Sequence, residues 1–142
     1  MNTGGASGAI SVCADTAQAI AHSMGEKQSV TIKRVSTRWR NPANTPDRFE
    51  DSVLTLFGQK KSMGELNDQS EYFTIVQTDS GTVARYLKPI IVQSVCLSCH
   101  GPEQSMTEEI RRTLKKRYPD DRALGYSAGD LRGAVSVVLP FR

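Results

Sequence analysis

Residues 96–100 read Cys-Leu-Ser-Cys-His and place two thiols and an imidazole within five positions. This spacing is typical of the covalent attachment of a c-type haem. Cys96 and Cys99 would each add to one of the two vinyl groups of the porphyrin, while the adjacent His100 would ligate the iron. The motif therefore predicts covalent haem c as the cofactor, with Cys96 and Cys99 as attachment points and His100 as a metal ligand.

Two other kinds of site use the same residue types. Two cysteines and a histidine also occur in zinc sites and in reactive dithiols. A closed structural zinc site usually takes four such ligands, often from a second close pair, whereas the whole chain has three cysteines and two histidines. We therefore favour haem attachment, and zinc binding or thiol redox chemistry stays open as the alternative.

Length and charge limit the class of protein. A chain of 142 residues fits one domain. Its formal net charge of +3 would be reduced by the two propionates of a haem, so this mild basicity predicts no nucleic-acid partner.

The expected chemistry also bears on location. Haem c is attached on the outer side of the cytoplasmic membrane or in an equivalent compartment, so we expect a protein of the periplasm or the thylakoid lumen. No apolar run is long enough to cross a bilayer, and residues 1–8 lack the regions of a signal peptide. We therefore expect a mature fragment of an exported or membrane-anchored precursor, with the signal outside this sequence.

The hydrophobic pattern predicts the elements that must position the motif. Apolar residues at three- and four-residue steps predict helices at 9–24 and 49–60. A third helix at about 108–117 is predicted by a cap at Ser105 or Thr107 and by acidic residues in its first turn and basic residues in its last. Alternating and β-branched residues predict strands at 29–37, 71–77, 83–92 and 134–139. The middle two strands are joined by a short turn and must be antiparallel. The order predicts an α+β fold, an antiparallel sheet with flanking helices in a single domain at 9–142, after a flexible N-terminus at 1–8.

The third cysteine, Cys13, lies on the apolar stripe of the predicted N-terminal helix. A free cysteine in such a place is more often a small core residue than a ligand. His22 follows nine residues later, about 180° around the helix, so we expect it to face solvent. The competing iron ligands are methionines, each of which we expect to be core or surface filler: Met24, Met63 and Met106.

Four strings follow one another along the chain: Arg-Asn-Pro-Ala-Asn-Thr-Pro at 40–46, the motif at 96–100, Tyr-Pro-Asp-Asp-Arg-Ala-Leu-Gly-Tyr at 118–126, and Gly-Asp-Leu-Arg-Gly-Ala-Val-Ser-Val at 129–137. Together they resemble a bacterial family of PAS-fold haem c proteins, best described from cyanobacteria and formerly catalogued as a domain of unknown function. The resemblance extends from residue 13 to residue 137. It implies a PAS-like sheet and a haem iron held by one histidine and one cysteine, here His100 and Cys13.

Such a site would suit a sensor. A thiolate opposite an imidazole favours ferric iron and lowers the reduction potential. Its displacement on reduction, or by NO, CO or O2, would move the N-terminal helix, so we expect a redox or gas sensor with a signalling partner. A low-potential electron-transfer cytochrome is the alternative, and weak peroxidase activity is a third. We do not expect an enzyme, because no spare histidine is well placed. A second copy of the chain is a further expected partner.

Arginines flank the proline-rich loop at Arg38, Arg40 and Arg48. A guanidinium there would pair with a haem propionate or would be solvated. The sequence leaves open whether Trp39 packs on the porphyrin or in the core.

Two further groups of polar residues are expected to have structural roles. Tyr118 and Tyr126 lie in the third string and are expected to hold its loop, with a hydrogen bond near the haem as the alternative. Asp130 and Arg132 stand beside glycines and are expected to fix a turn.

Overall fold

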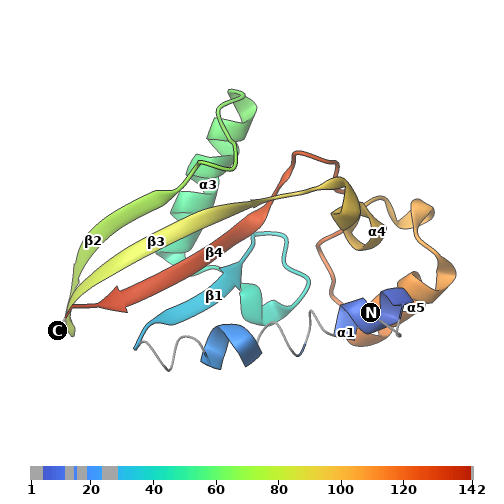
Figure 1. The fold of residues 1–142 in the computed structure, drawn as a ribbon, viewed down its shortest axis with the longest axis horizontal. Coiled ribbons are helices and arrows are strands. Elements are labelled where there is room, and N and C mark those ends of the chain that lie inside the picture. The colour runs from blue at the N-terminus through green and yellow to red at the C-terminus, as the bar shows by residue number, and fades with distance from the viewer. Residues whose placement is uncertain (1–4, 12–14, 16–18, 24–28, 142) are drawn as a thin grey trace.

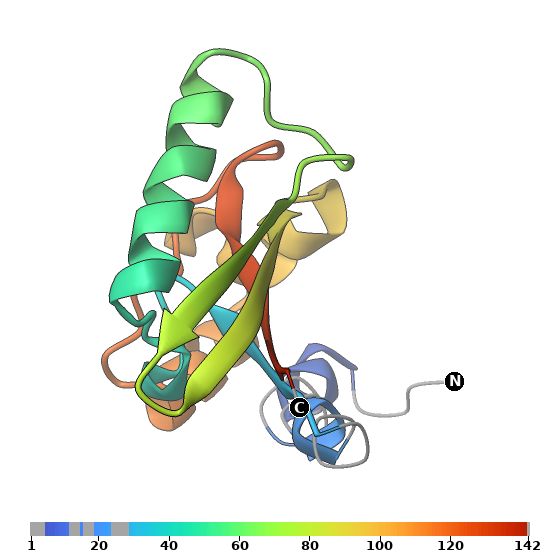
Figure 2. The same cartoon turned by 90° about the vertical axis from the view of Figure 1, so that its left-hand side faces the viewer.

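The computed structural model describes residues 5–11, 15, 19–23 and 29–141. Its centre is one antiparallel sheet with a long helix on one face, and the short helices at 5–11, 97–100 and 108–117 lie at one end (Figures 1 and 2). The strands are β1 (Thr31–Val35), β2 (Tyr72–Thr78), β3 (Gly81–Ile91) and β4 (Leu131–Pro140), in the spatial order β1-β4-β3-β2. The predicted α+β fold is therefore confirmed.

The helices are α1 (Gly5–Ser11), α3 (Arg48–Ser62), α4 (Leu97–His100) and α5 (Glu108–Arg117). Short 3-10 turns lie at Pro42–Asn44, Ser94–Cys96 and Glu103–Ser105. Thr107, one of the two candidate N-cap residues, caps α5: its side-chain oxygen accepts from the Ile110 amide at 3.3 Å. No described helix has the length and hydropathy that a membrane span requires.

The predicted N-terminal helix is only partly represented. Within 9–24 the described residues are helical at 9–11 and 19–23, and α1 already begins at Gly5. Ile10 is buried, but Ile20, expected on the same buried stripe, is 54% exposed, so the prediction of one continuous buried stripe is wrong there. His22 is exposed as predicted. Cys13 and Met24 lie outside the described residues.

The last strand begins three residues earlier than predicted, at Leu131. Ala134 of β4 pairs with Val35 of β1, and Gly133 comes just before that pair. A Cβ atom on Gly133 would lie 2.3 Å from the carbonyl oxygen of Val35, so the glycine permits an approach that a larger residue would prevent. A residue that resembles loop composition in the sequence thus belongs to the sheet.

The main core lies between α3 and one face of the sheet. Its buried members are Val35, Val53, Leu54, Phe57, Leu87 and Ala134. Glu50, in the first turn of α3, is also fully buried. Its carboxylate accepts from Ser136 Oγ at 2.7 Å and pairs with Lys33 Nζ at 3.0 Å and Arg85 Nη2 at 3.3 Å. One carboxylate therefore joins α3 to β1, β3 and β4.

Glu50 also completes a capping box. Asp47 accepts from the Glu50 amide at 2.8 Å, and Glu50 accepts from the Asp47 amide at 2.8 Å. The carboxylate that caps the N-terminus of α3 therefore also holds this end of the helix against the sheet.

We expect Glu50→Ala to lower the free energy of unfolding by about 3 kcal/mol, because Lys33 loses its counter-charge at a buried site and Arg85 keeps only its ion pair with Asp47. Urea unfolding followed by circular dichroism measures this. The matched control is Glu65→Ala at an exposed position, which we expect to leave stability nearly unchanged. Equal stability of the two variants would show that the buried network contributes nothing.

Candidate functional site

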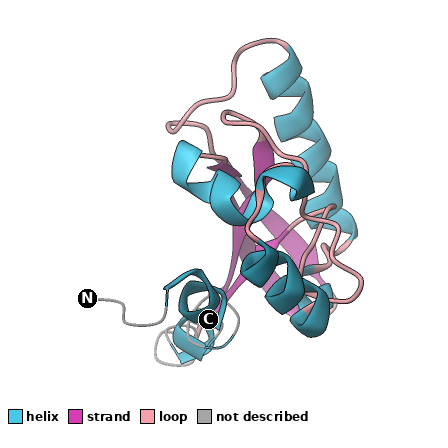
Figure 3. Cartoon of the chain, turned by 90° about the vertical axis from the view of Figure 1, so that its right-hand side faces the viewer, coloured by secondary structure: helices cyan, strands magenta, loops and turns pink. Residues whose placement is uncertain are grey.

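A cavity of about 240 Å³ lies where the short helices meet the end of the sheet. Its walls come from β1 and β4, from the end of β3, from α1, from the loop at 40–44 and from the motif. The lining residues are Ala9, Ile10, Arg34, Val35, Ser36, Arg40, Asn41, Asn44, Ile90, Val92, Cys96, Cys99, His100, Tyr118, Arg132 and Gly133. Figure 3 shows this end of the molecule, with the helices in front of the strands. The three motif residues thus share one cavity.

The motif forms a single helical turn. Cys96 ends a 3-10 turn, α4 follows directly, and both cysteines are free thiols of intermediate burial. Residues three apart share one side of a helix, so both thiols can face the same cavity. Gly101 ends the turn, where a Cβ atom would lie 2.6 Å from the Leu97 carbonyl oxygen. The local geometry therefore suits two thioether bonds to one ring.

His100 is held by a carbonyl oxygen. Its Nδ1 lies 2.8 Å from Ala123 O, which can only accept, so Nδ1 carries the hydrogen and the lone pair is on Nε2. Burial, and next the positive charge of Arg40, lower the pKa of His100 to about 4. The imidazole is therefore neutral at physiological pH, with its orientation and tautomer fixed as in most metal-ligating histidines.

The loop at 118–126 holds the motif through backbone hydrogen bonds. The amides of Gly125 and Tyr126 donate to the carbonyl oxygens of Gly101 and His100, both at 2.9 Å. Tyr126 is buried and carries the Arg38 guanidinium 4.1 Å from its ring centre. The structural role predicted for Tyr126 agrees with these contacts, whereas Tyr118 lines the cavity.

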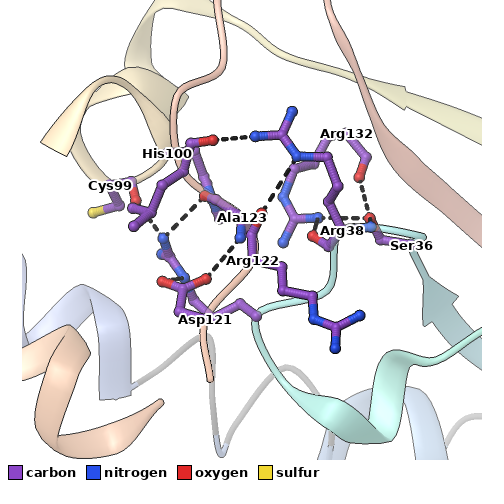
Figure 4. Close-up of polar contacts among 10 residues, drawn as sticks. Ser36, Arg38, Cys99, His100, Asp121, Arg122, Ala123 and Arg132 are labelled. Atoms are coloured by element: carbon purple, nitrogen blue, oxygen red, sulfur yellow. Dashed lines mark hydrogen bonds and ion pairs between the residues drawn. The ribbon is translucent and has the colours of Figure 1, made fainter. Parts of the chain in front are cut away.

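Arg40 differs from both sequence-based expectations. It is 9% exposed, and its Nε pairs with Asp121 Oδ2 at 2.9 Å. Its Nη2 donates to Cys99 O and, at 3.2 Å, to Ala123 O. Figure 4 shows Cys99, His100, Ala123 and Asp121 within this network. Arg40 is therefore neither a solvated loop residue nor a free partner for a propionate, because protein groups already bind it.

Two cavity arginines, Arg34 and Arg132, were missed as site residues. Arg132 Nη1 donates to Ser36 Oγ at 3.0 Å and to Arg38 O at 3.2 Å, and burial lowers the pKa of its guanidinium. The turn expected for Arg132 depends instead on Asp130, which accepts from the Ser127 amide at 2.8 Å. The sequence held one signal for Arg34. Neighbouring residues of a strand face opposite sides, so Lys33 and Arg34 had to supply a cation to each face.

The remaining candidates lie elsewhere. Trp39 stacks with Arg122, whose guanidinium is 4.4 Å from the ring, and Arg48 is exposed. Met63 is 62% exposed, and Met106 packs against Ile110 and Leu114 of α5. Neither methionine lines the cavity in the described part of the chain.

The zinc alternative gains no support from the described residues. Among them, no group of three or more His, Cys, Asp or Glu side chains could hold a metal ion. A zinc site would therefore need a ligand from outside the described ranges.

Gly133 gives a test of the cavity wall. We expect Gly133→Ala to lower the free energy of unfolding by about 1–3 kcal/mol, because the new methyl group meets the Val35 carbonyl oxygen and forces β4 away from β1. The control, Gly58→Ala within α3, has no atom within 4 Å of the added carbon. It should raise stability by about 1 kcal/mol through helix propensity. Thermal unfolding of both variants measures the difference, and a neutral Gly133→Ala would contradict the close approach.

Two comparisons with known proteins bear on this site. The family model described as Tll0287-like matches residues 2–140. The solved structure described as the cyanobacterial heme-protein Tll0287 is similar with a TM-score of 0.73 and 26% identity, covering 92% of this chain and 73% of that one. No curated protein matches the chain. Since the family model spans almost every residue, in accord with the resemblance carried by the four strings, the chain belongs to the Tll0287-like family.

Proposed function

We propose that this chain binds haem c covalently through Cys96 and Cys99, with His100 as an iron ligand. The observation that carries the proposal is the neutral, carbonyl-bound imidazole of His100 in the same cavity as both free thiols. The solved relative is described as a heme protein, which supports the same cofactor here. When bound, the haem supplies a one-electron couple and a position at which a diatomic gas can bind.

The other cavity walls suit a porphyrin. Ile10, Ile90 and Val92 supply apolar surface for the ring. Arg34 and Arg132 place guanidinium groups on the strand side of the cavity, and Arg132 forms none of the ion pairs found among the described residues. Arginine binds carboxylates with paired donors, so these two residues are the partners we propose for the propionates.

We propose Cys13 as the second axial ligand. Ile10, at the edge of the cavity, is three residues before it. An extended chain spans at most about 3.6 Å per residue, so three residues of chain after Ile10 can reach no farther than about 11 Å from it. This reach supports ligation, and the resemblance to the family implies the same pair of ligands.

The proposed role is a redox or gas sensor. Ile10 of α1 is buried in one cluster with Met106, Ile110 and Leu114, which lie on or beside α5. Release of Cys13 from the iron would therefore change the tension on α1 and, through Ile10, on α5. A low-potential electron-transfer protein is the second candidate, favoured if both axial ligands stay in place in both redox states.

The proposed location is the periplasm or the thylakoid lumen. Thioether bonds to a motif of this kind are made outside the cytoplasm, and the free thiols of Cys96 and Cys99 are the groups that would react. The signalling or redox protein that receives the output would contact the surface formed by α1 and α5.

We expect the wild type, expressed with a haem c maturation system, to retain haem after acid-acetone extraction and to give a c-type pyridine haemochrome. The double variant Cys96→Ala/Cys99→Ala should release its haem into the organic phase, because only the thioether bonds resist extraction. The Met106→Leu variant is the control for altered packing near α5. Complete extraction from the wild type would refute covalent attachment.

We expect Cys13→Ala to change the ferric optical and resonance Raman spectra from those of a thiolate-ligated low-spin haem, because one strong ligand is lost. The control is His22→Ala, which alters an exposed residue nearby in sequence. An unchanged ferric spectrum would remove Cys13 as a ligand. In the ferrous wild type, rapid binding of CO would support the sensor, and resistance to CO would favour electron transfer.

A further inference from the structure

We propose that the buried ion pair of Arg40 and Asp121 sets the reduction potential of the haem at His100, with Arg40 raising the potential and Asp121 lowering it. This inference rests on the proposed function. Both residues are positioning groups behind the axial histidine, and neither is expected to touch the iron.

The two residues act on His100 through one shared atom. Ala123 O accepts from His100 Nδ1 at 2.8 Å and from Arg40 Nη2 at 3.2 Å. An oxygen that already accepts from a cation is a weaker acceptor for a second donor. The His100 N–H therefore keeps more of its proton, and its Nε2 gives less electron density to a metal.

Asp121 anchors this arrangement from the other side. Its Oδ2 pairs with Arg40 Nε at 2.9 Å, and its Oδ1 accepts from the Ala123 amide at 2.8 Å. Arg40 also donates to Cys99 O, so the pair contacts the motif both at the histidine acceptor and at the backbone before it. The contacts of Arg40 and Asp121 thus fix the position of the Ala123 carbonyl oxygen and of the guanidinium next to it.

Burial makes these charges effective. The side chains of Arg40 and Asp121 are 10% and 8% exposed, so water and salt screen them little. The positive charge of Arg40 is the second cause of the lowered pKa of His100, after burial itself. The guanidinium therefore already acts on the ring that would bind the iron.

The sign of each contribution follows from the charge of the iron. Ferric haem carries one more positive charge than ferrous haem. Arg40 disfavours the ferric state both by its charge and by weakening the donation of His100, so it raises the potential. Asp121 has the opposite charge and lowers it.

The test is redox potentiometry of the wild-type holoprotein and five variants. Arg40→Gln should lower the potential and Asp121→Asn should raise it. The matched controls are Arg112→Gln and Glu108→Gln, which make the same two charge changes in an ion pair that is 77% and 75% exposed on α5. Both controls should give shifts much smaller than the buried variants, since exposed charges are screened.

Opposite shifts separate tuning from damage, because loosened packing would move both buried variants in one direction. Arg40→Lys, which keeps the charge without the forked donors, should lie nearer the wild type than Arg40→Gln. Shifts of one sign, or shifts no larger than those of the controls, would overturn the inference. If Arg40→Gln does not load with haem, Asp121→Asn and Arg40→Lys decide, and an unraised potential in Asp121→Asn overturns it.

This failure is distinct from failure of the proposed function. If the wild type gives no c-type pyridine haemochrome, the cofactor proposal itself is wrong. If it gives one and the potentials do not respond to the pair, the cofactor stands and only the tuning role is lost.

Discussion

The hydrogen bond from His100 to the carbonyl oxygen of Ala123 is the interaction on which the site depends. It joins the motif to a loop more than twenty residues later, leaves one nitrogen of the ring available, and determines which nitrogen that is. Without this hydrogen bond, the imidazole of His100 could rotate, and its Nε2 would have no fixed orientation in the cavity that holds the two thiols. Arg40 fixes the position of this carbonyl oxygen, because it binds the same atom and holds the loop through Asp121, while its charge weakens the oxygen as an acceptor for His100.

The sheet is an independent frame for this site. Its own fixed point is Glu50, which connects α3 to three strands on the face where the main core lies. The cavity lies at the end of the sheet, where Gly133 of β4 lies close to the Val35 carbonyl of β1. The structure therefore has two buried ionic centres. The one at Glu50 holds the sheet to α3, and the one at Arg40 and Asp121 holds the motif to the loop at 118–126. In each centre, removal of one partner would leave a buried charge with fewer compensating groups, which lowers stability.

Local patterns were sufficient for the elements and insufficient for their ends. Period-two and period-3.6 spacing predicted four strands and the helix α3, because burial of one face imposes those periods. The cap and the charges at its two ends predicted α5. The sequence did not predict the early start of β4, because the role of Gly133 depends on its close approach to Val35 in the folded chain. Ile20 shows the other limit. A stripe of apolar residues indicates a helix face, but only packing decides whether a neighbour covers it.

The sequence by itself determined the reactive groups of the site, because a five-residue motif is a local property: two thiols, an imidazole and their order. Its odd cysteine, Cys13, stays a prediction. The tertiary structure alone decided that Arg40, read as a solvated residue or a propionate partner, instead lies behind His100 with Asp121, eighty-one positions away. No local pattern carries that information, because the partners of a buried charge depend on which distant segments fold against it.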